Sequence, residues 1–318
     1  MDDEELGRIF MPYFDREFNR IKNNSGLDFI YYTNLTTIHS ILRNKEIWLR
    51  NVSCMNDFQE VHQGYTLVRT YLFKNQGNNF QRLINLLLTI KPTVKWKEIV
   101  NDLVSNSEPY FLYNTYIACL SEHSVSDDQY GKLSMWRAYG RGNGGAIVIN
   151  KNKIVGNQII IPGVMLSRVA YLSENGFNDE FDSVLNNIEQ NISVLKLEDD
   201  NRITQLIVGA IIAAILSIKH PGFVEEKEWR IIFVDNPNNK GSQLKKEVEC
   251  INGIPQNVYK LKLDTLLPQL VRKVIIGPTQ YSGVSQAVLL DDLRILLRKD
   301  NVLNYLSVSN IPIRPECI

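Results

Sequence analysis

Residues 224–234, Val-Glu-Glu-Lys-Glu-Trp-Arg-Ile-Ile-Phe-Val, open with a cluster of charges and continue into a strongly apolar strand. If the strand includes its first residues, its two-residue period places Glu226, Glu228 and Arg230 on one face. Two carboxylates and a guanidinium that lead into a buried strand are costly to desolvate. Two explanations remain open: an ion pair at the edge of a sheet, and a carboxylate in an active site.

Short strands and helical segments surround this segment. Runs rich in β-branched and aromatic residues predict strands at 29–33, 47–49, 116–121, 146–149, 164–171, 258–263 and 271–278. Apolar residues at helical spacing predict helices at 5–22, 35–42, within 60–108, around 134–139, within 181–218 and at 285–298. Short strands interrupted by helices indicate an α+β fold with a mostly non-sequential sheet, and they argue against a doubly wound parallel sheet.

The same pattern predicts the domain organisation. We expect an N-terminal helix within residues 1–24, followed by a single catalytic-type α+β domain over 25–318. Helical insertions are expected within that domain at about 61–110 and 178–220. With 44% hydrophobic residues, the chain can form a substantial core.

Charge and cysteine content exclude several classes of protein. Thirty-five basic residues balance thirty-five acidic ones, so no overall positive field favours nucleic acid. The four cysteines are far apart and form no C-x-x-C pair, which argues against a zinc site and a disulfide framework. The acidic start, Met-Asp-Asp-Glu-Glu, lacks the pattern of a secretion signal, so we expect a cytoplasmic protein.

One apolar run resembles a membrane span. Residues 206–216 are all apolar, with Arg202 before the run and Lys219 after it. The run is shorter than the roughly 20 residues that a bilayer requires. We therefore expect a helix buried on all sides, and no membrane partner.

A candidate binding site follows the first predicted strand. Tyr31 and Thr33 share one face of that strand, and Asn34 is a good N-cap for the next helix. An anionic or amide group of a ligand could meet free backbone N–H groups at this helix start. Ordinary packing of a Tyr and a Thr within a strand is the alternative.

A second candidate lies in Asn56-Asp57-Phe58-Gln59-Glu60. Asp57 and Glu60 have the spacing of a capping box, so a helix start explains both of them. Capping explains Asn56 less well, which leaves Asn56 as a candidate binding residue.

A third candidate is an aromatic pair beside a glycine-rich loop. Trp136 and Tyr139 share one face of a short helix, and residues 140–145 contain four glycines. The pair is either part of the core or a platform for a ligand. The loop precedes a strand and lacks the P-loop pattern, so neither P-loop nor Rossmann chemistry is supported.

The common hydrolase signatures are absent from the sequence. The four histidines have no metal-binding spacing, and no G-x-S-x-G elbow occurs. We therefore expect no metal.

Five blocks together resemble a large bacterial family of unknown function, in which such blocks recur in the same order. They are 31–33 (Y-Y-T), 56–60 (N-D-F-Q-E), 119–122 (C-L-S-E), 134–139 (S-M-W-R-A-Y) and 226–230 (E-K-E-W-R). The resemblance spans roughly residues 29–280, and the last two blocks are the most specific.

The strand, helix and return strand at the start also resemble the ADP-ribosyltransferase fold, particularly its DNA-modifying toxins. That resemblance implies a split mixed sheet with helical insertions. It places Tyr31 and Thr33 at a His-x-Thr motif that holds the nicotinamide ribose of NAD, with tyrosine replacing histidine. It also implies that Glu228, with Glu226 two residues earlier, is the catalytic carboxylate of an E-x-E-like pair.

The same resemblance implies the other contacts to NAD. Trp136 or Tyr139 would stack on nicotinamide or adenine, Ser121 would bond an amide or ribose group, and Asn56 completes the candidate set. A carboxylate stabilises the oxocarbenium-like charge that develops when the nicotinamide–ribose bond breaks, and this chemistry needs no metal.

The leading hypothesis is an intracellular NAD-dependent ADP-ribosyltransferase, such as a toxin or antiphage defence effector, that modifies a macromolecular acceptor. Whether the acceptor is nucleic acid or protein stays open. The alternatives are an NAD glycohydrolase, in which water is the acceptor, and a non-enzymatic nucleotide-sensing module, which Tyr31 in the histidine position favours. A metal nuclease built from Asp57, Glu60, Glu226 and Glu228 ranks last, because no spacing signature supports it.

Overall fold

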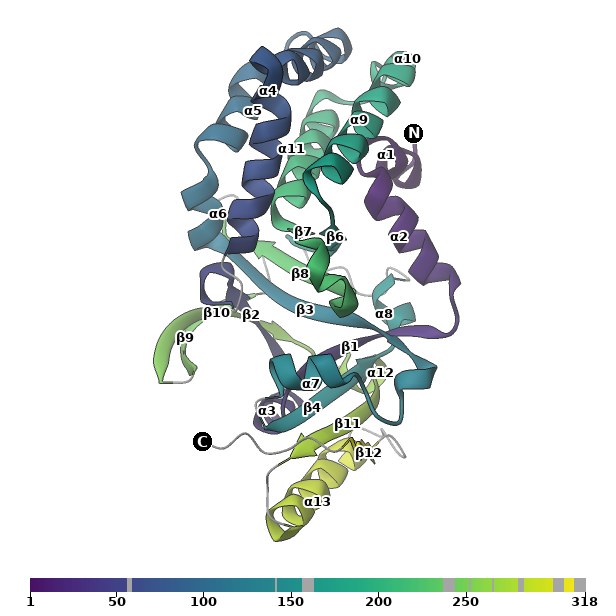
Figure 1. Cartoon of the computed structure of the whole chain (residues 1–318), viewed down its shortest axis with the longest axis vertical. Helices are drawn as coiled ribbons and strands as arrows, with labels where there is room; N and C mark the ends of the chain where they lie inside the picture. The colour runs from purple at the N-terminus through teal and green to yellow at the C-terminus, as the bar shows by residue number, and fades with distance from the viewer. Residues whose placement is uncertain are drawn as a thin grey trace.

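A central sheet separates two groups of helices (Figure 1). The structure is a computed structural model, and it describes residues 1–55, 59–140, 142–155, 163–236, 244–251, 253–264, 266–279, 283–299 and 306–311. The helices α4 (Gln59–Ile90), α5 (Trp96–Ser105), α9 (Glu174–Gln190) and α11 (Asp200–Leu216) gather at one end of the molecule. At the other end, α13 (Gly283–Lys299) lies beside the last strands of the sheet.

The described residues form a ten-stranded, mostly antiparallel sheet. Its main path runs β12 (Leu306–Val308), β11 (Val271–Thr279), β4 (Asn143–Ile149), β1 (Leu27–Asn34), β3 (Thr115–Ser124), β2 (Glu46–Asn51), β10 (Ile254–Lys262) and β9 (Lys245–Ile251). A branch adds β8 (Glu228–Val234) to β3, and β5 (Val164–Arg168) to β8. Within this sheet β11 and β12 form a parallel pair. The expectation of an α+β fold with a non-sequential sheet is confirmed.

The sheet divides at β3. On one edge of β3, β1 pairs with residues 121–124 and β2 pairs with residues 116–117. On the opposite edge, β8 pairs continuously with residues 115–121. Residues 118–120 therefore lie where β1 and β2 diverge, and we call this point the β3 split.

The unit that creates the split is the strand, helix and strand expected from the sequence. Helix α3 (Leu35–Asn44) joins β1 to β2, and the Asn34 side chain caps it by accepting the Thr37 N–H at 2.8 Å. The helix ends at Lys45, whose φ of 53° is left-handed. Asn34 as N-cap is confirmed.

Helices on the two faces bury separate cores. Helices α4, α5, α9 and α11 cover one face of β3 and β8, where Ile117 and Ile232 join their apolar side chains. On the opposite face, α3 and α13 belong to a core that contains Phe29 and Val274, and Phe14 of α2 packs edge-on against Trp229. A smaller group around Trp136 lies under α7 (Leu133–Tyr139).

The N-terminal segment forms two helices where the sequence analysis expected one. Helix α1 (Asp3–Phe10) ends at Met11, and α2 (Pro12–Asn23) begins with a proline in its first turn. Proline has no N–H and disfavours helical geometry at the preceding residue, so the helix is interrupted there.

Helix α11 differs from the helix buried on all sides that the apolar run predicted. One stripe of it is fully buried, formed by Ile203, Ile207, Ile211 and Ile215. Leu216 at its end is also buried, but the other apolar residues are only partly buried, and several of them line a cavity. Among the described helices, none is long and apolar enough to cross a bilayer.

Three strands were not predicted from the sequence. Strand β7 (Ile218–Lys219) has only two residues and follows the apolar helix α11. Strand β9, Lys-Lys-Glu-Val-Glu-Cys-Ile, is largely exposed at the edge of the sheet and carries little apolar signal. Strand β12 has only three residues and is too short for a periodic pattern.

Gly64 permits the close approach of α4 to α11. A Cβ atom there would lie 2.1 Å from the carbonyl oxygen of Ile215. We expect Gly64→Ala to destabilise the protein by about 1–3 kcal/mol, because backbone and not a flexible side chain must move. Urea unfolding would measure this change.

Gly209→Ala is the matched control, because the added Cβ on α11 would have no atom within 4 Å. Its expected effect is opposite in sign, a gain of about 0.5–1 kcal/mol from helix propensity. Equal effects of the two substitutions would show that the helices do not approach as described.

Candidate functional site

Five charged side chains from four elements meet beside the β3 split, and we call them the ionic cluster. They are Glu60 on α4, Lys219 on β7 (Ile218–Lys219), Glu226 at the end of the 3₁₀ helix η3 (Pro221–Glu226), and Glu228 and Arg230 on β8. The candidate carboxylates Glu226 and Glu228 are thus themselves members of a group of ion pairs.

Arg230 is the buried centre of the ionic cluster. Its Nε donates to Glu228 Oε1 at 2.7 Å, and its Nη2 donates to Glu60. Its Nη1 donates to the Leu216 carbonyl oxygen at 2.6 Å, at the end of α11. Three of its donors are therefore satisfied, as a buried guanidinium requires.

Lys219 joins the three carboxylates. Its Nζ lies 2.7 Å from Glu60, 2.7 Å from Glu226 and 3.2 Å from Glu228. Burial alone would lower the pKa of Lys219, but Glu228 and Glu60 raise it, so the lysine stays charged. Three carboxylates and two cations leave one net negative charge, so one carboxylate gains a proton readily.

The carboxylates at 226 and 228 have pKa values displaced in opposite directions. Burial would raise the pKa of Glu228, but Arg230 and Lys219 lower it to about 2. Burial raises the pKa of Glu226, and the charge of Glu228 adds to this against the opposing effect of Lys219. Glu228 is therefore permanently ionised, whereas Glu226 can exchange a proton.

Glu226 does not lie on the strand, which corrects the arrangement that would put 226, 228 and 230 in one row. The strand begins at Glu228, because Lys227 adopts a left-handed φ of 44° and turns the chain. Glu226 nevertheless reaches the ionic cluster through Lys219, and its side chain is 16% exposed against 5% for Glu228. Glu226 is thus the more accessible acid.

Hydrogen bonds from tyrosines hold this turn. Tyr139 on α7 donates its hydroxyl to Glu226 Oε1 at 3.3 Å. The Tyr171 hydroxyl accepts the Glu228 N–H at 2.8 Å and so fixes the first residue of the strand. Tyr139 therefore lies beside Glu226.

Ser121 and Cys119 form the adjoining part of β3. Ser121 is in register with Glu228 on one side and with Ile30 on the other, and it is buried. Cys119 is in register with Arg230 and lies within the β3 split. Burial and the Glu228 carboxylate raise the pKa of the Cys119 thiol well above its usual value, so it remains protonated.

Tyr31 and Thr33 occupy the opposite side of β1 from Ile30. Tyr31 is half-buried and packs against the core under α3. Burial raises its pKa to about 12. Because Ile30, Ser121 and Glu228 are in register, Tyr31 lies on the face of the sheet opposite to the ionic cluster. Thr33 pairs with Gly145, three residues beyond the last pair of β1 with β3, and so lies further from the carboxylates.

Trp136 is part of the core. It is 3% exposed, its Nε1 donates to the Tyr130 carbonyl oxygen at 2.8 Å, and Tyr32 meets its ring edge-on. Cβ atoms added at Gly144 and Gly277 would lie 2.9 and 2.7 Å from the indole. Close glycine contacts hold this ring within the core.

The structure describes only the last two residues of the 56–60 block. Asn56 and Asp57 lie outside the described residues. Glu60 lies in the first turn of α4, and its carboxylate binds Arg230 and Lys219.

Two residues of this site were not predicted as site residues from the sequence. Lys219 follows an apolar helix, and Tyr171 ends a predicted strand, so both looked structural. No group of three potential metal ligands with suitable geometry occurs among the described residues.

Comparison with known families gives a match over one part of the chain. Residues 135–231 match the model of a family described as a protein of unknown function, DUF2971. The matched segment contains Trp136, Tyr139, Lys219 and both candidate glutamates, whereas the blocks at 31–33, 56–60 and 119–122 lie outside it. No curated protein matches the chain, and no solved structure matches it.

Proposed function

We propose that the protein cleaves the nicotinamide–ribose bond of NAD and transfers ADP-ribose to a macromolecular acceptor. The observation that carries this proposal is the meeting of Glu226 and Glu228 at Lys219, whose Nζ lies 2.7 Å from the first and 3.2 Å from the second. The pKa of Glu226 is raised there, whereas the pKa of Glu228 is lowered. Neighbouring carboxylates separated in this way are typical of sites where one acid stabilises charge and the other moves a proton.

The two acids have different roles in this proposal. Glu228, ionised at all ordinary pH values, supplies a fixed negative charge near the sugar as positive charge develops. Glu226 accepts the proton of the attacking hydroxyl group, because its raised pKa and partial exposure suit a general base. Lys219 is a positioning residue that fixes the distance between the acids.

The residues around Glu226 fit the sugar of NAD. Ribose hydroxyls need hydrogen-bond acceptors, and the Glu226 carboxylate and the Tyr139 hydroxyl supply them at one place. The divergence of β1 and β2 along β3 agrees with the split sheet that the resemblance to ADP-ribosyltransferases implies. These contacts support NAD as the substrate.

One observation favours a second function, a nucleotide-sensing module without turnover. Glu228 already has two close counter-ions, Arg230 at 2.7 Å and Lys219 at 3.2 Å, which weaken its field at a substrate. Such a protein would bind NAD and leave it intact.

Adenine-labelled NAD, incubated with purified protein and with nucleic-acid or protein acceptors, distinguishes these functions. Label on a macromolecule supports transfer, free labelled ADP-ribose supports hydrolysis, and bound but intact NAD supports sensing. We expect Glu228→Gln to release nicotinamide at least about 100-fold more slowly than wild type. Equal release by both proteins would remove Glu228 from the mechanism.

A further inference from the structure

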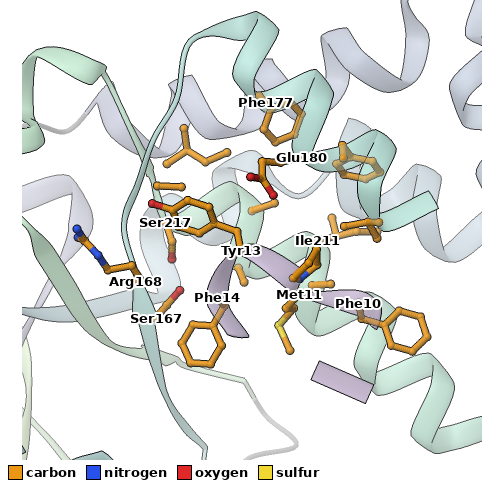
Figure 2. A pocket seen from close by; sticks show the side chains of 18 of the residues that line it. Phe10, Met11, Tyr13, Phe14, Ser167, Arg168, Phe177, Glu180, Ile211 and Ser217 are labelled. Carbon is orange, nitrogen blue, oxygen red and sulfur yellow. The ribbon is translucent and has the colours of Figure 1, made fainter. Parts of the chain in front are cut away.

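A separate apolar cavity lies between the N-terminal helices and the helical end of the molecule (Figure 2). Its volume is about 190 Å³, and residues of α1, α2, β5, α9 and α11 line it. Apolar side chains form most of its wall, including Phe10, Phe177 and Ile211. The cavity is partly open to solvent, and its apolar wall favours an apolar molecule over water.

One side of the cavity is polar. Tyr13, Ser167 and Ser217 lie together on that side in Figure 2. Ser167 and Ser217 are each 4% exposed, yet the Ser217 hydroxyl has no hydrogen-bond partner among the described residues. Oxygen Oε2 of Glu180, which also lines the cavity, likewise lacks a partner within the described part of the chain. Unsatisfied buried oxygens are costly, and a ligand that donates to them would remove that cost.

We propose that this cavity binds a small, uncharged, mainly apolar molecule that carries one N–H or O–H donor. The volume sets the size: an apolar cavity of roughly 150 Å³ holds a benzene ring, so about 190 Å³ holds a slightly larger ring system. The unsatisfied oxygens of Ser217 and Glu180 require a hydrogen-bond donor on the ligand.

The charges around the cavity favour an uncharged ligand. Nε of Arg168 lies 3.4 Å from Glu122 and 3.6 Å from Glu17, without a hydrogen bond among the described residues, and its Nη1 donates to the Glu228 carbonyl oxygen at 2.6 Å. Glu180 is paired with Arg16 at 2.5 Å. An anionic ligand would meet the Glu180 carboxylate, and a cationic ligand would find that carboxylate already neutralised.

The cavity is distinct from the ionic cluster but adjoins it. Ser217 lies two residues before Lys219, and its carbonyl oxygen accepts the Ala170 N–H at 2.7 Å. The preceding residue, Leu216, accepts a hydrogen bond from Arg230. The proposal rests on the cavity alone and holds whether or not the protein cleaves NAD.

Indole is a suitable probe, and benzofuran is its matched control, because the two have similar size and only indole donates an N–H. We expect calorimetry to show saturable binding of indole at one site of the full-length protein. We expect benzofuran to bind wild type about fivefold more weakly than indole does, because it lacks one hydrogen bond. We expect indole to bind Ser217→Ala about fivefold more weakly than wild type for the same reason. Equal affinities in all three experiments would overturn the assignment of the donor.

Ala210→Phe tests the location, because Ala210 lines the cavity and a larger side chain would fill it. Indole binding should be lost in this variant and kept in Gly209→Ala, whose added Cβ has open space. Ser217→Ala, a smaller change, tests the same location if Ala210→Phe does not fold. No saturable binding to wild type, or unchanged binding to both cavity variants, would overturn the proposal.

Discussion

Arg230→Met is expected to lower the free energy of unfolding by about 3–5 kcal/mol, because it removes one partner from a buried network of ion pairs. The substitution keeps most of the side-chain volume, so the loss reports on charge more than on packing. Glu60 and Glu228 would be left with Lys219 as their remaining buried counter-ion. Urea unfolding followed by circular dichroism measures the change.

Arg294→Met is the control for this prediction. Arg294 also pairs with a carboxylate, Asp291 at 3.0 Å, but the two side chains are 55% and 72% exposed. Exposed pairs contribute little, so a change below about 1 kcal/mol is expected. A loss for Arg230→Met as small as that for the control would show that the ionic cluster does not stabilise the fold.

Glu226→Gln is expected to reduce kcat/KM for nicotinamide release by about 10²–10⁴-fold, the usual contribution of a general base. The variant should fold normally, because glutamine retains hydrogen-bonding atoms for Lys219 and Tyr139. Initial rates at several NAD concentrations measure this effect, with unfolding curves as the check on folding.

Glu225→Gln is the matched control, because Glu225 is the exposed neighbour on the same 3₁₀ helix. It removes the same charge from the same surface without touching the ionic cluster. A similar loss of activity in both variants would indicate a general electrostatic effect and would contradict a base at 226.

The pH dependence of stability provides a further test of Glu226. Its pKa is raised above 4.5, so the folded protein holds this proton more tightly than the unfolded chain does. The stability that results is present below pH 4.5 and is lost as the pH rises through the raised pKa. Relative to wild type, Glu226→Gln should therefore become more stable between about pH 5 and pH 8. A constant difference over this range would show that the pKa is not raised.

The sequence predicted the helices and strands of the site better than it predicted how they are arranged in space. The strand at 228–234, the helix capped by Asn34 and the helix with Tyr139 were all recognisable, because each depends on residues close together in the chain. The turn at Lys227 was not, because a positive φ at a residue other than glycine has no clear sequence signal. The position of Glu226 was therefore wrong, although its proximity to Glu228 was right.

Most of the other features that the sequence did not predict depend on contacts between residues far apart in the chain. Glu60 fitted a capping box at a helix start, and Lys219 fitted the polar flank of an apolar helix. These local patterns explained both residues, so no ion-pair partner was expected for either of them. Their ion pairs form only when α4, β7 and β8 pack together. The cavity likewise depends on side chains from helices and strands far apart in the chain, which no local pattern brings together.

The release of free nicotinamide from NAD by purified wild-type protein tests the proposed function most directly. A time course in the presence of nucleic-acid and protein acceptors is predicted to show steady, enzyme-dependent release that Glu226→Gln abolishes. Folded wild-type protein that leaves NAD intact with every acceptor would contradict the proposal.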